Sequence, residues 1–145
     1  METREKKRGD RFDGYWLRDE VPAMNQFMGY LLPNRADNEA FIRQEIDLRP
    51  MDAFLAKKNA GLEKDKYSYF HVILAACVKC FVLRPRMSRF ISGNRIYQRD
   101  HISVAFVVKK RFEDSSSEGL AYKRYTGDDT IDTLHASILE EIYQC

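Results

Sequence analysis

The sequence is poor in cysteine, in excess charge of one sign and in long apolar runs, and each shortage argues against a class of protein. Three cysteines in 145 residues do not make a disulfide framework. Lysine and arginine number 24 against 22 acidic residues, and a net charge of +2 makes no case for nucleic acid by itself. No apolar signal region or membrane-length apolar run is present. We therefore expect a soluble protein of the reducing cytoplasm, with no membrane partner.

The length and the charge pattern predict one domain preceded by an arm. The chain is long enough for a single core, and it has no internal repeat. Residues 1–20 mix charges of both signs, and we interpret them as a charged N-terminal arm. Its Tyr15, Trp16 and Leu17 are expected to dock onto the body or onto a neighbouring subunit. A basic arm for nucleic acid is the weaker interpretation, because acidic residues are interspersed. Residues 21–145 then form the domain.

The stretch around residues 68–83 is the most apolar in the chain and is predicted to be the central helix. It reads SYFHVILAACVKCFVL, in which His71 and Lys79 share one narrow stripe at helical spacing. Pro85 ends the helix, because its ring disfavours helical geometry at the preceding residue. A helix that is apolar on nearly every other side should be enclosed by protein. We expect these side chains to be largely buried: Val72, Leu74, Ala76, Cys80 and Phe81.

A hairpin and a long strand are predicted to follow this helix. Residues 90–92 and 95–98 flank Gly93-Asn94, a pair that suits a tight two-residue turn. Residues 101–108 then alternate bulky and small side chains, which predicts a strand with one thick face. Elsewhere the periodicity and the caps predict helices over 21–32, 49–60 and 131–142, strands over 40–48 and 120–125, and a loop over 113–119. Together these elements predict a mixed α/β fold.

Cys77 and Cys80 have the spacing of a redox pair or of half a zinc site. A redox pair normally opens a helix, where the thiol pKa is lowered, but these cysteines lie inside one. A zinc site would need two further ligands, and His71, His101 and His135 are scattered along the chain. We therefore predict no metal site, and we expect both thiols to pack in the core, reduced and metal-free.

Five arginines fall within sixteen residues that contain no acid: Arg84, Arg86, Arg89, Arg95 and Arg99. Their first interpretation is structural, with arginines at a helix end satisfying carbonyls and others pairing with acids across subunits. The second is that they hold phosphates, because guanidinium forks match phosphate oxygens. The third is an RNA backbone, which Phe90 and Tyr97 alone do not support as a stacking platform.

The segment LRPRMSRFISGNRIYQRDHISVAFVVKK, residues 83–110, resembles the middle of a known domain. That domain is the acyltransferase catalytic domain of 2-oxo acid dehydrogenase complexes, which is related to chloramphenicol acetyltransferase. In that family a helix ends at a proline, an asparagine follows three residues later, and a hairpin and a long strand come next. Here Ser88 stands in the place of the asparagine.

The resemblance extends weakly to both sides of this segment. Residues 41–47, FIRQEID, are similar to the family's extended segment, and Gly119-Leu120 resembles its Gly-Leu-x-x-Pro, with Arg124 or its neighbours where the proline would fall. The match runs from about Met24 to Ile142. It implies a mixed sheet with flanking helices, chloramphenicol-acetyltransferase-like, of which this chain is the N-terminal, incomplete portion.

The resemblance also implies a substrate class and an assembly. The family transfers acyl groups between coenzyme A and a lipoyl or other thiol acceptor, at a site between the subunits of a homotrimer. Coenzyme A is the implied cofactor, with no group bound covalently, and its phosphates are assigned to Arg89, Arg95 and Arg99. The family's catalytic base lies in a His-x-x-x-Asp motif. Ala75, Ala105 and Leu139 stand four residues after the three histidines, so we assign no catalytic residue.

Three functions remain open at this point. The first is an acyltransferase-like protein of the 2-oxo acid dehydrogenase type. The second is a non-catalytic trimeric scaffold or interaction module of the same fold. The third is a phosphate- or RNA-binding domain that uses the arginine cluster, for which RNA binding would depend steeply on salt.

Overall fold

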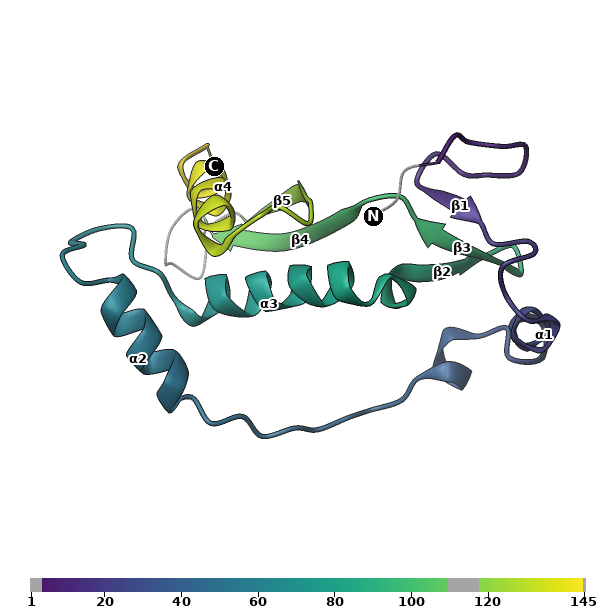
Figure 1. Cartoon of the computed structure of the whole chain (residues 1–145), viewed down its shortest axis with the longest axis horizontal. Helices are drawn as coiled ribbons and strands as arrows, with labels where there is room; N and C mark the ends of the chain where they lie inside the picture. The colour runs from purple at the N-terminus through teal and green to yellow at the C-terminus, as the bar shows by residue number, and fades with distance from the viewer. Residues whose placement is uncertain (1–3, 110–117, 145) are drawn as a thin grey trace. The chain divides into compact units, whose positions relative to one another are not determined.

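The computed structural model describes residues 4–109 and 118–144. This part of the chain is a mixed α/β protein with four α-helices and two small antiparallel sheets (Figure 1). It divides into two compact units, each built from two separate stretches of sequence. Unit 1 comprises Met1–Ile46 and Arg84–His101, and unit 2 comprises Asp47–Leu83 and Ile102–Cys145. The boundary at residue 20 and the chloramphenicol-acetyltransferase-like topology stay predictions.

Unit 1 is built on a three-stranded sheet. Its strands are β1 (Gly14–Trp16), β2 (Arg89–Ser92) and β3 (Arg95–Arg99), in the order β1-β3-β2. The hairpin between β2 and β3 turns at Gly93 and Asn94, whose φ angles are 55° and 60°. Both values lie in the left-handed region that a type I′ turn requires, which confirms the predicted hairpin.

The N-terminal arm supplies one edge of this sheet. Tyr15 pairs with Gln98 and Trp16 with Tyr97 in the β1–β3 register. Tyr15, Leu17 and Tyr97 are buried. The expected docking of the arm therefore occurs by strand pairing. The remaining elements of unit 1 are α1 (Ala23–Leu31) and short 3-10 turns at Arg35–Asn38 and Pro85–Ser88.

Unit 2 contains three helices and a two-stranded sheet. The helices are α2 (Arg49–Lys58), α3 (Tyr69–Leu83) and α4 (Ile131–Gln144), and the strands are β4 (Ile102–Lys109) and β5 (Glu118–Tyr125). The strands pair from Ile102 with Tyr125 to Lys109 with Glu118. Thr130 caps α4, since the Thr133 backbone amide donates to its hydroxyl at 3.3 Å. These elements match the predicted helices and strands closely, but β5 begins at Glu118, so the predicted loop was wrong for residues 118–119. Residues 113–117 of that loop lie outside the described part.

The core of unit 2 is a single cluster between α3, α4 and one face of the β4–β5 sheet. It consists of Leu74, Val78, Ile102, Tyr125, Leu134 and Ile138. Of the predicted core of the central helix, Leu74 is buried, while Val72 and Phe81 are only half-buried. Ala76 and Cys80 are exposed, so these two predictions were wrong.

The expectation that α3 is enclosed on all sides was also wrong for the described part of the chain. Only His71, Leu74 and Val78 are buried on it, and they lie at spacings of three and four, on one stripe. One helix and a two-stranded sheet cover only this stripe. Ile73, on the other side, keeps 54% of its surface exposed.

The predicted strand over residues 40–48 does not form. This stretch contains neither helix nor strand, and its side chains are exposed (Figure 1). Alternating side chains suit an extended backbone, but a strand also needs a neighbouring strand to accept its hydrogen bonds. Within the described residues this stretch has none.

Candidate functional site

The three arginines assigned to coenzyme A phosphates lie on opposite faces of the unit 1 sheet. Arg95 and Arg99 lie two residues to either side of Tyr97 along β3, so all three share one face. Arg89 on β2 pairs with Gln98, whose side chain points to the other face. The sheet therefore separates Arg89 from the other two, and phosphate binding by the three residues stays a prediction.

The guanidinium groups of Arg95 and Arg99 already have partners in the protein. Arg95 lies over the Trp16 ring, 4.3 Å from its centroid, in a cation–π contact. Arg99 lies 4.5 Å from the centroid of the Phe90 ring and donates from Nη1 to Asp13 at 3.1 Å. These contacts favour a structural role for both arginines, but the acid that pairs with Arg99 belongs to the same unit and not to another subunit.

Asp13 binds two arginines at the unit 1 sheet, Arg11 and Arg99. It is buried, and its two carboxylate oxygens accept hydrogen bonds from Arg11 and Arg99 at 3.0 and 3.1 Å. Burial raises the pKa of Asp13, but the hydrogen bond and charge of Arg11 and the charge of Arg99 outweigh it, so that the pKa is lowered. Arg11 also donates to Ser92 on β2. The carboxylate thus ties the arm to both strands of the hairpin.

Arg89 sits on the other face and has a single hydrogen-bond partner there. Its Nε donates to the side-chain oxygen of Gln98 at 3.3 Å. Gln98 in turn donates to the carbonyl of Pro85 at 2.8 Å and to Ser88 at 2.5 Å. Ser88, which stands in the place of the family's asparagine, therefore joins the end of the 3-10 turn to β3.

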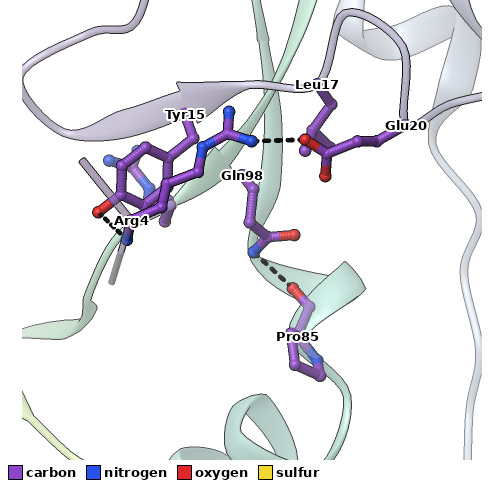
Figure 2. A pocket seen from close by; sticks show the side chains of 7 residues that line it. Arg4, Tyr15, Leu17, Glu20, Pro85 and Gln98 are labelled. Atoms are coloured by element: carbon purple, nitrogen blue, oxygen red, sulfur yellow. Dashed lines mark hydrogen bonds and ion pairs between the residues drawn. The ribbon is translucent and has the colours of Figure 1, made fainter. Parts of the chain in front are cut away.

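A pocket of about 380 Å³ opens beside this network, entirely within unit 1 (Figure 2). It is lined by Arg4, Tyr15, Leu17, Glu20, Pro85, Gln98 and Arg99. Figure 2 shows the Arg4 guanidinium reaching Glu20, to which it donates at 2.5 Å. Because each lining guanidinium faces a carboxylate, Arg4 with Glu20 and Arg99 with Asp13, the pocket offers little free positive charge to an anion.

Arg84 and Arg86 differ from the other three. Both are exposed around the 3-10 turn, and in the described part of the chain neither guanidinium has a hydrogen-bond or ion-pair partner. They are the members of the cluster with guanidinium groups available to a phosphate ligand. The sequence assignment to Arg89, Arg95 and Arg99 did not include them.

His101 forms a pair with the acid that precedes it. Its Nδ1 lies 2.5 Å from Oδ1 of Asp100, and Lys6 donates to the other oxygen of that carboxylate at 2.7 Å. A carboxylate on Nδ1 orients an imidazole and favours a proton on that nitrogen. The His-x-x-x-Asp motif does not include this pair, because it requires an acid four residues after the histidine and Asp100 precedes His101.

His71 and His135 lie together inside unit 2. The sequence predicts a narrow polar stripe for His71 and shows the histidines only as scattered along the chain. Instead His71 is 7% and His135 8% exposed, and their ring centroids are 4.7 Å apart. The physical reason is that α3 and α4 pack on each other, and each histidine lies on the packed side.

Cys77 and Cys80 have exposed side chains, so their predicted core packing was wrong. The buried stripe of α3 runs through Leu74 and Val78, and neither cysteine lies on it. No group of three or more His, Cys, Asp or Glu side chains is placed to hold a metal ion among the residues that the structure describes.

Comparisons with protein-family models, with curated proteins and with solved structures found no match for this chain. Across residues 4–109 and 118–144, no helix has the length and apolar character needed to cross a membrane.

Proposed function

We propose that this chain is an acyltransferase-like protein, resembling the catalytic domain of 2-oxo acid dehydrogenase complexes, that works as a homotrimer. Its substrates would be coenzyme A and an acyl thioester of a lipoyl or other thiol. The observation that carries the proposal is an apolar surface left open on unit 2. A surface of this kind on a globular protein commonly marks an interaction site.

The open surface has two parts. On α3 it consists of Phe70, Ile73 and Leu83, each at least 44% exposed. On the outer face of the β4–β5 sheet it consists of Val107, Leu120 and Tyr122, each at least 53% exposed. Val107 pairs with Leu120 in the sheet, so these side chains lie next to each other. Covering both parts would remove a large apolar area from water, which favours association.

The order of elements supports the proposed fold. The helix α3 is followed by Pro85, the β2–β3 hairpin and the long strand β4, which is the order implied by the resemblance. The chloramphenicol-acetyltransferase-like fold is part of the proposal. The proposal also includes the homotrimer, in which neighbouring copies of the chain cover the open apolar surface on α3 and on the β4–β5 sheet.

The histidines of this chain do not supply the catalytic base that the family uses. Acyl transfer to coenzyme A needs a base that reaches the thiol. None of the three histidines lies in the family's motif, and His71 and His135 are buried against each other. These observations favour the second candidate, a non-catalytic module of the same fold, for the chain by itself.

Light scattering after size exclusion tests the assembly. The expected mass is three times the 17.1 kDa chain. Val107→Lys should give a monomer, because a lysine in an apolar contact must lose its hydration. Ala136→Lys adds the same charge at an exposed position of α4 and serves as the matched control. A monomeric wild type, or equal effects of the two variants, would contradict the assembly.

An assay with acetyl-coenzyme A and dihydrolipoamide tests the chemistry. We expect no turnover by the chain or by a triple variant, His71→Ala, His101→Ala, His135→Ala. Turnover that the triple variant abolishes would mean that the base lies among these residues, and it would support the catalytic form of the proposal over the scaffold.

A further inference from the structure

The first turn of α3 is closed by an unusual cap. Ser68 precedes the helix, and His71 is its third residue. The His71 backbone amide donates to the Ser68 carbonyl at 3.1 Å, and the Ser68 backbone amide donates to His71 Nδ1 at 3.0 Å. In an ordinary capping box a glutamate or glutamine at this third position accepts from the cap residue's amide. Here an imidazole does so.

This geometry favours one protonation state of the ring. A backbone amide can only donate, so it bonds Nδ1 of His71 only when that nitrogen is unprotonated and Nε2 carries the proton. The Ser68 hydroxyl lies 2.9 Å from Nδ1 and can donate to it in the same state. The side-chain Nε2 atom is buried and has no hydrogen-bond partner in the described part of the chain. A second proton, on Nδ1, would remove the hydrogen bond from the Ser68 amide, which closes the cap, and would leave only the Ser68 hydroxyl to accept it.

A second buried imidazole stands against the first. His135 of α4 lies with its ring centroid 4.7 Å from that of His71, and its Nε2 is likewise buried without a partner. The Tyr67 ring stacks on His135 at 3.9 Å. Charge added to either ring would therefore lie next to another imidazole in a site shielded from water.

The charged groups around this pair include one carboxylate, Asp132, which attracts a charge on His135 but is held mainly by Lys58 and Tyr67. Asp132 of α4 accepts from the Tyr67 hydroxyl at 2.7 Å and pairs with Lys58 of α2, also at 2.7 Å. The remaining charged neighbour is Lys109 of β4, which lines a pocket of about 440 Å³ together with His71. Among the described residues the pair thus faces two cations and one carboxylate that is already engaged.

We propose that His71 is an acid-sensitive helix cap, and that protonation of the buried His71–His135 pair releases the first turn of α3 from α4. Unit 2 is then most stable at neutral pH and loosens as the pH falls through the range in which histidine titrates. The proposal does not depend on acyl transfer or on the trimer, because every contact that carries it lies within unit 2.

The direction of the pKa agrees with the geometry. Burial, and then the neighbouring His135, lower the pKa of His71 and outweigh the backbone hydrogen bond with Ser68, which raises it. For a histidine with a lowered folded-state pKa, the folded form binds fewer protons than the unfolded form. The stability that follows is complete above the unfolded pKa of about 6.5 and is lost as the pH falls toward the folded value.

Substitution of His71 by glutamine gives the sharpest test. Glutamine is a usual residue at this capping position, and it does not titrate. Hydrogen exchange of the backbone amides in the first turns of α3, corrected for intrinsic rates, is compared at about pH 7.5 and about pH 5.5. The wild type should lose protection about fivefold, the effect typical of losing a helix cap. His71→Gln should lose none, whereas the control His101→Gln should behave as the wild type does.

An equal loss of protection in wild type and His71→Gln would overturn the proposal. If His71→Gln does not fold, nitrogen chemical shifts of the imidazole in the wild type decide instead. We expect a bare Nδ1 and a protonated Nε2 at neutral pH, with loosening of α3 as Nδ1 gains its proton. The opposite tautomer, or protonation of His71 without any change in α3, would equally overturn it.

Discussion

Replacing Leu74 by alanine should destabilise unit 2 strongly, whereas the same change at Ile73 should not. Leu74 is 5% exposed and belongs to the core cluster with Leu134 and Ile138. Truncation removes buried methylenes and leaves a cavity, which together cost about 2–5 kcal/mol. Ile73 is 54% exposed, and alanine has the higher helix propensity, so its loss should stay below about 1 kcal/mol.

Urea denaturation followed by far-ultraviolet circular dichroism measures both free energies of unfolding. The measurement is made at several protein concentrations, because Ile73 lies on the proposed association surface. We expect Leu74→Ala to be costly at every concentration and Ile73→Ala to lower only the concentration-dependent part of the stability. A cost below about 1 kcal/mol for Leu74→Ala would refute the assignment of the core.

Three further changes test local features. Asn94→Val should cost about 1–3 kcal/mol in thermal denaturation, because a β-branched residue is strained at φ 60°, while Asn94→Gly should be nearly neutral. Since the folded-state pKa of Asp13 is lowered, unit 1 should lose stability as the pH falls below about 4, as followed by Trp16 fluorescence. Asp13→Asn should weaken this dependence, and Asp10 and Asp100, whose pKa values are also lowered, should carry the rest. Thr130→Ala should cost about 1 kcal/mol through the lost cap of α4, measured by urea denaturation.

Local sequence signals predicted most of the regular structure correctly. The Gly93-Asn94 pair predicted the hairpin turn, and Pro85 predicted the end of α3. The helical spacing from Ile131 to Ile142 predicted α4. Each of these signals acts through the backbone conformation of neighbouring residues, so a single sequence contains it in full.

The predictions that were wrong concern tertiary contacts: which strands pair and which helix faces are buried. Residues 40–48 alternate like a strand, but pairing requires a partner whose position the local pattern does not contain. The apolar residues around α3 predicted burial on all sides, yet only one stripe is covered in the described chain. If the open face is covered by further copies, as proposed, the apolar pattern carries information about the assembly.

Candidate functional residues were the hardest to predict, since they come together through tertiary contacts. The arginine cluster was visible in the sequence, but the strand register that places Arg89 on one face and Arg99 on the other was not. His71 and His135 are 64 positions apart, and only the packing of α3 on α4 makes them neighbours. Their contact could not be derived from spacing.

The interleaving of the two units has a consequence for how the nascent chain folds on the ribosome. Unit 1 takes two of its three strands, β2 and β3, from Arg84–His101, so its sheet cannot form until these residues have been made. At that moment Asp47–Leu83 is already looped out, and its own sheet, β4 and β5, has still to be synthesised. The apolar residues of α3 therefore cannot be buried against β4 and β5 until those strands have been made. A stop at residue 101 would leave unit 1 able to close and unit 2 without its sheet, which makes this the informative length for a truncation.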